Sequence, residues 1–360
     1  MQKSSAMRKK GKADTSHSPF LPPFGRFLGM PGSLPGKEPV IGHKQLNPIL
    51  DQLRAMRLIY VAGKGGVGKS VCSAATGIWA SGQGKDTLAF SMDPAHSLSD
   101  IFDIDIGSQP KRISDHLHAY EPDLTEEARG FFRRYKNILT ALFGLFEVEV
   151  KPEDFGNMPG VSELIFMDKL NDIFVEKQYD FVVIDSAPTA MVLPLLQLPA
   201  ITTGFVTRVL GMRSKWIGVL NLLESGFGDS ILKEIRTMRV KAETMRNALI
   251  DPKTASIIVV TIPEKAAVEE SRRLIETVES HGVHVASIII NHVMRECDCQ
   301  FCQRKMASQT SYIQDLQSRY SDKRVAILPD YGAEVKGECL QQVAQDLYGE
   351  GQMELWTPGQ

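Results

Sequence analysis

The chain of 360 residues has little cysteine and almost no net charge. Its 5 cysteines, three of which lie within residues 297–302, do not resemble the disulfide framework of a secreted protein. A formal net charge of −2 gives no sign of a nucleic-acid partner. No apolar run reaches the roughly 20 residues that a membrane-spanning helix needs, and no signal-peptide core follows the N-terminus. These absences favour a cytoplasmic protein that contacts membranes only through partners.

One large domain is expected between two tails. Residues 1–45 are rich in proline, glycine, serine and basic residues, which predicts a disordered basic tail. A transit peptide is the weaker interpretation, because no amphipathic helical period is visible there. Residues 46–350 have the composition of a globular domain, and residues 351–360 are expected to form a C-terminal tail.

Short apolar runs alternate with helical patterns over most of this domain. The runs lie at residues 56–62, 87–93, 179–185, 256–263, 285–291 and 324–330. Their continuous apolar character is typical of strands that are buried on both faces of a parallel sheet. Between two of them, residues 264–282 show the spacing of an amphipathic helix. The sequence therefore predicts an α/β fold with a doubly wound, mainly parallel sheet, which binds ligands at the carboxyl ends of its strands.

Two long segments, residues 125–175 and 201–250, depart from this alternation because they are helical in pattern and carry few strand signals. Within residues 131–148 the apolar side chains at helical spacing are Phe131, Tyr135, Ile138, Leu142 and Leu145. We expect both segments to form an inserted helical subdomain. Packing of the helices against each other accounts for most of their apolar side chains.

The strongest chemical signal is the glycine loop GKGGVGKS, which lies between an apolar run and a helical pattern. It matches the phosphate-binding loop of P-loop NTPases, in which backbone N–H groups close around phosphate oxygens. The residues expected to bind ATP here are Gly63, Lys64, Gly65, Gly66, Val67, Gly68, Lys69 and Ser70. Lys69 is expected to neutralise the terminal phosphates, and the Ser70 hydroxyl to bind Mg²⁺. A second lysine, Lys64, has no obvious role within its own loop.

Several further motifs agree in order and spacing with one known family. They are SMDPAHSLSDIFD at 91–103, VVIDSAPTAMVLPLLQLP at 182–199, NHV at 291–293, the cysteine pair at 299–302 and ILPDYGAEVKG at 327–337. Over residues 56–348 the chain resembles the arsenite-pump and tail-anchored-protein-targeting ATPases, which belong to the deviant P-loop class that includes MinD and the nitrogenase iron protein. In that class a lysine at the position of Lys64 reaches across a homodimer interface to the partner's nucleotide. A solvated surface lysine is the alternative.

Two aspartates at strand ends are candidates for catalysis and metal binding. Asp93 is expected to orient the attacking water or accept its proton, and the resemblance implies the same catalytic role. Asp185 fits a Mg²⁺ ligand that acts through a water molecule. Aspartates at strand ends and helix caps also occur for structural reasons. Ser97 and His96 lie beside Asp93 and are candidates for sensing the phosphate, although a structural His96 is nearly as plausible.

The resemblance also implies residues that contact the base. Asn291 matches an asparagine that contacts adenine, and residues 329–335, which begin with Pro329, match a segment that closes over the base. An amide side chain suits this task because it both donates and accepts hydrogen bonds.

The pair Cys299 and Cys302 has the C-x₂-C spacing of zinc ligands, but a structural zinc ion wants four. Two subunits would complete the set, and the targeting ATPases hold their dimer with zinc at the matching pair. Cys297 is a spare thiol, His292 is a weaker candidate ligand, and Cys339 stands alone. A redox pair or free thiols are the alternatives.

The resemblance implies that residues 91–103 and 182–199 are two switch segments, and one departure from the family lies in the second of them. The family's Gly-His-Thr and a later arginine are replaced here by Ala190, Met191, Val192 and Pro194. A glycine gives the backbone freedom to move, and polar side chains couple the phosphate state to that movement. Their loss is expected to weaken this coupling and to affect the rate of hydrolysis, while nucleotide binding is retained.

The leading hypothesis is a homodimeric ATPase that captures and targets the hydrophobic segment of a tail-anchored membrane protein. Apolar helices at 131–146 and 205–223, with Met212, Met238 and Met245 nearby, are expected to build the client groove. The main rival is the energising ATPase of an arsenite pump, which in the family uses cysteines of the helical region. No cysteine lies between Cys72 and Cys297 in this chain. A nucleotide-switched scaffold with low turnover is the third hypothesis.

Overall fold

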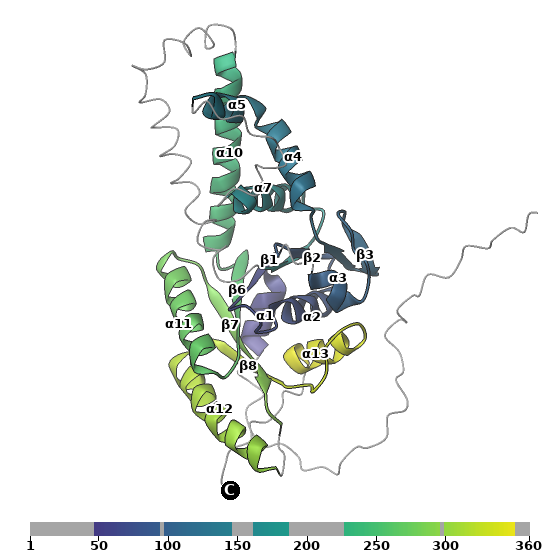
Figure 1. Ribbon diagram of the computed structural model, residues 1–360, viewed down its shortest axis with the longest axis vertical. Coiled ribbons are helices and arrows are strands. Elements are labelled where there is room, and N and C mark those ends of the chain that lie inside the picture. The colour runs from purple at the N-terminus through teal and green to yellow at the C-terminus, as the bar shows by residue number, and fades with distance from the viewer. Residues whose placement is uncertain (1–46, 94–96, 146–160, 187–226, 296–298, 350–360) are drawn as a thin grey trace, which may run out of the picture. The chain divides into compact units, whose positions relative to one another are not determined.

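The computed structural model of the chain describes residues 47–93, 97–145, 161–186, 227–295 and 299–349. An eight-stranded sheet lies at the centre of this part of the chain, in the order β3-β4-β2-β5-β1-β6-β7-β8 (Figure 1). The strands are β1 (Leu58–Ala62), β2 (Thr87–Ser91), β3 (Lys111–Ser114), β4 (Leu117–Tyr120), β5 (Phe181–Asp185), β6 (Ala255–Thr261), β7 (Val285–Val293) and β8 (Arg324–Pro329). All neighbours are parallel except β3 and β4. The predicted α/β fold with a mainly parallel sheet is confirmed.

Helices cover both faces of the sheet. They are α1 (Asn47–Ala55), α2 (Lys69–Ser81), α3 (Ser97–Phe102), α4 (Leu124–Arg134), α5 (Lys136–Leu145), α7 (Val161–Glu176), α10 (Phe227–Ile250), α11 (Lys265–Ser280), α12 (Gln300–Arg319) and α13 (Cys339–Tyr348). Strand β1 shows why two faces must be covered. Leu58 and Tyr60 enter one hydrophobic core with side chains of α7, α10, α11 and α12, whereas Ile59 and Val61 enter another with α1, α2 and α13. Complete burial of one such side chain contributes about 1.5–3 kcal/mol.

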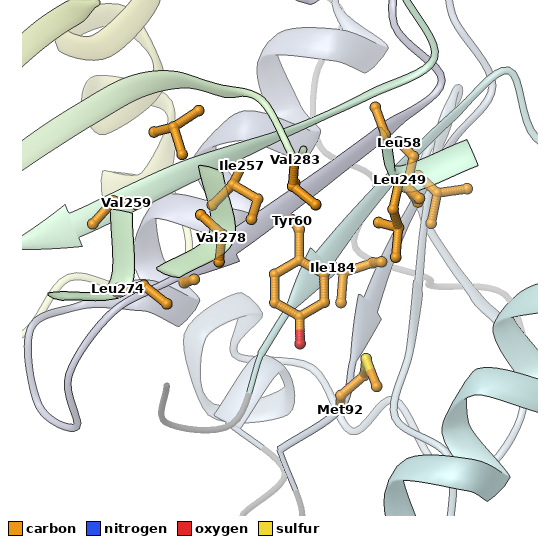
Figure 2. Close-up of a cluster of buried hydrophobic side chains, with 14 of the residues drawn as sticks. Leu58, Tyr60, Met92, Ile184, Leu249, Ile257, Val259, Leu274, Val278 and Val283 are labelled. Atoms are coloured by element: carbon orange, nitrogen blue, oxygen red, sulfur yellow. The ribbon is translucent and has the colours of Figure 1, made fainter. Parts of the chain in front are cut away.

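Tyr60 marks the centre of the first core. Figure 2 shows its ring among Met92, Ile184 and Ile257, with the hydroxyl directed toward Met92. Met92 and Ile184 directly precede Asp93 and Asp185, so the chain just before each predicted site aspartate is packed in this core. The ends of β2 and β5 are therefore packed directly against the helices on that face.

Helices α4, α5, α7 and α10 pack together as a helical layer (Figure 1). Its core consists of Ala128, Phe131, Tyr135, Ile138, Leu139, Ile165, Ile231 and Ile235. Mutual packing thus accounts for these apolar side chains, as the sequence indicated. Met238 packs partly buried against this cluster, but Met245 is 1% exposed in the core beneath the sheet. The expectation that Met245 contributes to a client groove is therefore wrong, because the sheet already covers it.

A polar network ties three helices of this layer together. The carboxylate of Asp168 on α7 accepts hydrogen bonds from the Tyr135 hydroxyl at 2.6 Å and from Lys241 of α10 at 2.8 Å. Arg134 of α4 donates to the same carboxylate, and it also pairs with Asp172 at 2.8 Å. A buried carboxylate is tolerated only when its charge is balanced in this way, and loss of one partner is strongly destabilising.

The helical pattern predicted over residues 131–148 is interrupted at Tyr135. This residue has φ −111° and ψ 28° and ends α4, and a new helix begins at Lys136. The backbone amides of Asn137 and Ile138 donate to the carboxylate of Glu234 on α10 at 3.2 and 2.8 Å. A side chain about 100 residues distant therefore caps α5, which no local pattern indicates.

The strands β3 and β4 were not predicted. Residues of β3 are exposed or half-buried, so that strand has no apolar run to reveal it. Strand β4 extends the sheet beside β2, with Tyr120 opposite Phe90. Among the described residues no helix is both long and apolar enough to cross a membrane.

Candidate functional site

Functional residues predicted from separate motifs lie along one edge of the sheet, where the parallel strands end. Gly63 follows β1, Asp93 follows β2, Asp185 ends β5, Asn291 lies near the end of β7 and Pro329 ends β8. The carboxyl ends of parallel strands meet at one edge, which is why distant motifs converge there.

The glycine loop owes its shape to close backbone contacts. A Cβ atom at Gly63 would lie 2.2 Å from the carbonyl oxygen of Val260. Gly68 has φ +92°, and a Cβ atom there would lie 2.3 Å from the Asn291 side-chain nitrogen. The sequence of a strand, this loop and the N-terminus of α2 places backbone N–H groups where they can bind phosphate oxygens.

Lys69 is the first residue of α2 and is 7% exposed. Its ammonium group donates to the carbonyl oxygen of Lys64 at 3.2 Å. Burial lowers the pKa of Lys69, and the negative charges of Asp185 and Asp93 act in the opposite direction. A phosphate at the loop would supply further negative charge, which would stabilise the protonated amine.

Asp185 lies beneath a group of serine hydroxyls. Ser73 of α2 donates to one carboxylate oxygen at 3.2 Å, and Ser97 of α3 donates to the other at 3.2 Å. The hydroxyls of Ser97 and Ser70 lie 2.9 Å apart. Burial raises the pKa of Asp185 to about 6, although the hydroxyl of Ser70 and the charge of Lys69 oppose this shift. Hydroxyl and carboxylate oxygens are the ligands that Mg²⁺ prefers, so this donor set fits the ion.

Asp93 lies two residues beyond β2 and is half-buried. Its backbone amide donates to the Ser91 hydroxyl at 3.2 Å, which holds the turn after the strand. The preceding amide, of Met92, donates to the carbonyl oxygen of Asp185 at 2.8 Å. The chain leading to Asp93 is thus hydrogen-bonded to the end of β5. The negative charges of Asp93 and Asp185 both raise the pKa of Lys69.

Asn291 is 6% exposed, and its amide donates to the carbonyl oxygen of Val67 in the glycine loop at 3.0 Å. The structure thus brings this residue to the loop, where it supports Gly68. Pro329 is buried and lies opposite Val293 in the neighbouring strand. The adenine contacts of Asn291 and Pro329 stay predictions.

The cysteine pair lies at the first turn of α12, away from the glycine loop in sequence. Cys299 caps the helix, because its sulfur accepts the backbone N–H of Cys302 at 3.2 Å. Cys299 is exposed and Cys302 is partly exposed. No three potential metal ligands gather anywhere in the described part of the chain. Two thiols per chain are therefore what the structure offers at this position.

Sequence reasoning missed two residues that hold the site. Ser73 lies one helical turn after Lys69, on the same side of α2, and that spacing was the available signal. Glu121 is a buried carboxylate just after β4, and no motif pointed to it.

Other predicted positions lie outside the described residues. These are His96, Ala190, Met191, Val192, Pro194, Met212, Cys297 and the apolar segment 205–223.

The chain is similar in sequence to proteins of one known family. The family model described as "Anion-transporting ATPase" matches residues 56–349. The "ATPase ASNA1 homolog 1" of Paramecium tetraurelia is 29% identical, and the match covers 82% of this chain and 93% of that protein. The "Putative arsenical pump-driving ATPase 1" of Aquifex aeolicus is 28% identical, over 82% of this chain and 79% of that protein. The "ATPase asna-1" of Caenorhabditis elegans is 26% identical, over 80% and 91%.

Proposed function

Because the chain belongs to the anion-transporting ATPase family and hydrolyses ATP, we propose that it is a cytoplasmic homodimeric switch that captures hydrophobic segments of membrane proteins. The observation that carries this proposal is that residues next to the ATPase site and residues of the helical layer belong to one hydrophobic core. Met92 and Ile184, which precede Asp93 and Asp185, pack in one cluster with side chains of α7 and α10. A change in the phosphates at the strand ends can therefore move the helical layer.

The ATPase site works by positioning and charge. The loop amides and Lys69 hold the phosphates, and Asn291 with the segment 329–335 contacts the base. Ser70 would hold Mg²⁺, with Asp185 acting through a water molecule, and the ion would supply positive charge that offsets the charge of the phosphates. Asp93 orients the attacking water and accepts its proton. Lys64 of one subunit contacts the nucleotide of the other.

The surface of α10 supports a role in client capture. A groove on this helix is lined by Leu232, Thr237 and Val240, with the basic residues Lys233 and Arg236 beside them. Val240 is 59% exposed, so a client segment can reach it. An apolar helix with polar ends fits such a surface.

The arsenite-pump alternative is favoured by the names of some relatives but not by the cysteines. Thiolates are the soft ligands that a metalloid needs. The chain has none between Cys72 and Cys297, a range that contains the whole helical layer.

Client capture can be tested by co-expression with a tagged C-terminal segment of about 20 apolar residues. We expect this segment to co-purify with the wild-type protein, and a serine-substituted segment of equal length not to. Val240→Asp should reduce capture about tenfold, because it places a charge on the groove. Val175→Asp is the matched control, since Val175 is 55% exposed on α7. Equal retention of both segments, or ATP turnover that rises with arsenite but not with client, would contradict the proposal.

The dimer is proposed to be held by zinc at the cysteine pair. Cys299 and Cys302 lie together at the start of α12, where the Cys299 sulfur accepts the backbone N–H of Cys302. Two such pairs related by a dyad give the four sulfur ligands of a structural zinc site. Phe301 between them is 75% exposed, and a partner subunit would cover it.

We expect one Zn²⁺ per dimer in protein purified without chelator. The double substitution Cys299→Ser and Cys302→Ser should remove the metal and dissociate most of the nucleotide-free dimer, because the four ligands are lost together. Elemental analysis and light scattering measure both effects. Cys339→Ser, at the exposed start of α13, is the matched control and should change neither. A wild-type dimer without zinc that tolerates the double substitution would refute the bridge.

A further inference from the structure

Glu121 is a buried acidic residue at the carboxyl edge of the sheet. It follows β4, and its side chain is 2% exposed. The register of β4 on β2 places Tyr120 opposite Phe90, so Glu121 lies beside the stretch of chain that leads to Asp93. A carboxylate is costly to bury, and it persists only where hydrogen bonds or charges compensate it.

Three of the bonds that compensate this carboxylate come from the first turn of α3. The backbone amides of Leu98 and Ser99 donate to one carboxylate oxygen at 2.6 and 3.1 Å. The Ser99 hydroxyl donates to the other oxygen, and it accepts the backbone amide of Ile106 at 3.2 Å. Glu121, at the end of β4, therefore accepts hydrogen bonds from the first turn of α3, where helix N–H groups need acceptors.

The residue that begins α3 is Ser97, whose hydroxyl lies in the group around Asp185. It is 2.9 Å from the Ser70 hydroxyl and 3.2 Å from a carboxylate oxygen of Asp185. Mg²⁺ holds six oxygens at about 2.0–2.1 Å, so two adjacent ligand oxygens lie about 2.9 Å apart. The spacing of Ser70 and Ser97 matches that edge of the octahedron. The two hydroxyls are hydrogen-bonded to each other, and their separation would also suit neighbouring ligands of one ion.

We propose that Ser97 is a second hydroxyl ligand of the nucleotide-bound Mg²⁺ and that Glu121 is the positioning residue that holds it in place. This inference rests on the proposed magnesium site of Ser70 and Asp185. Glu121 acts through the first turn of α3, because its bonds fix the two residues that follow Ser97. Partners in the outer shell of a metal site typically affect metal affinity or activity by about 10–100-fold.

The test measures ADP affinity by calorimetry with Mg²⁺ and with chelator, together with ATP turnover. In Glu121→Ala, the gain in affinity that Mg²⁺ gives and the turnover number should both fall by about 10–100-fold. ADP affinity in chelator should stay near the wild-type value, because the glycine loop and Lys69 are unchanged. Glu121→Gln should recover much of the loss, since its amide can still accept from the backbone of α3.

Glu127 supplies the matched control. Its carboxylate also contacts β4, through the Tyr120 hydroxyl at 2.6 Å, and it pairs with Lys169 at 2.9 Å. Within the described part of the chain, the side-chain partners of Glu127 lie on β4 and α7 and not on α3. Glu127→Ala should lower the melting temperature without changing the Mg²⁺ effect. A purely structural role for Glu121 would make the two variants behave alike, and that outcome would overturn the inference.

A double-mutant cycle tests whether Glu121 works through Ser97. We expect Ser97→Ala to lose the Mg²⁺ effect, and Glu121→Ala added to it to cause little further loss. Additive losses would overturn the inference. If Glu121→Ala does not fold, Ser99→Ala removes one of the three bonds and should show the same pattern at smaller size. If Mg²⁺ does not change the ADP affinity of the wild-type protein, the magnesium site itself is overturned. If Mg²⁺ raises ADP affinity in Ser97→Ala and Glu121→Ala as much as in the wild type, only this inference is overturned.

Discussion

Asp93→Asn lowers the turnover number for ATP by about 10²-fold or more, the scale expected for a positioned acid or base, and leaves ATP binding nearly unchanged. Asparagine has the same shape but cannot accept the proton of the attacking water. The phosphates are held elsewhere, by the loop amides and Lys69, so affinity does not depend on this carboxylate. The main-chain bond from Asp93 to Ser91 also survives the substitution. Steady-state kinetics and calorimetry with ATP would separate the two effects.

Asp100→Asn is a suitable control for this experiment. Asp100 lies on α3 in the same switch segment, but it is exposed. Its loss should leave turnover within about twofold, since an exposed charge contributes little. Wild-type turnover in Asp93→Asn would remove Asp93 from the mechanism. An equal fall in both variants would point to charge on the segment and not to one catalytic group.

Lys64→Ala should abolish most ATP hydrolysis while each subunit stays folded and binds nucleotide. The structure places the carbonyl of Lys64 against the ammonium of Lys69, so that backbone contact does not require the Lys64 side chain. If the side chain acts in the partner's site, its removal takes one cation from the transition state there. Loss of a cation at a transferring phosphoryl group costs about 10³-fold or more.

Mixing Lys64→Ala with Asp93→Asn subunits gives the diagnostic result. In the heterodimer, the Lys64→Ala subunit keeps its own Asp93 and receives Lys64 from its partner, so one of two sites is intact. Random exchange in a two-fold symmetric dimer therefore restores about a quarter of wild-type activity. Each variant mixed with itself should stay inactive. If exchange is proven by mass spectrometry and no activity returns, Lys64 acts within its own chain.

The strands of the sheet were predictable from sequence because each is a short apolar run ending at a turn. β1, β2, β5, β6, β7 and β8 all overlap the predicted runs. Burial on both faces leaves few polar positions, so such strands can be recognised from their own sequence without knowledge of a neighbouring strand. β3 escaped this reasoning because it is an exposed edge strand without an apolar run, and β4 because it has only 4 residues and includes His118.

The site was only partly predictable for a related reason. The glycine loop and Asp185 depend on local geometry, namely a strand followed by a turn, so their residues carry a local signal. Ser73 carries only its helical spacing from Lys69 as a signal, and Glu121 carries none. Glu121 became meaningful only when β4 joined β2 and brought the carboxylate to the start of α3. The cap that Glu234 provides to α5 is a second example.

The sequence by itself determined the α/β class, the glycine loop and the strand-end aspartates, because each is encoded within a few adjacent residues. Only the tertiary structure decided the break at Tyr135, the burial of Met245 and the grip of Glu121 on α3. These features depend on hydrogen bonds and packing between segments that are distant along the chain. Such contacts acquire their energy only when folding removes both partners from water, so no single stretch of sequence contains them.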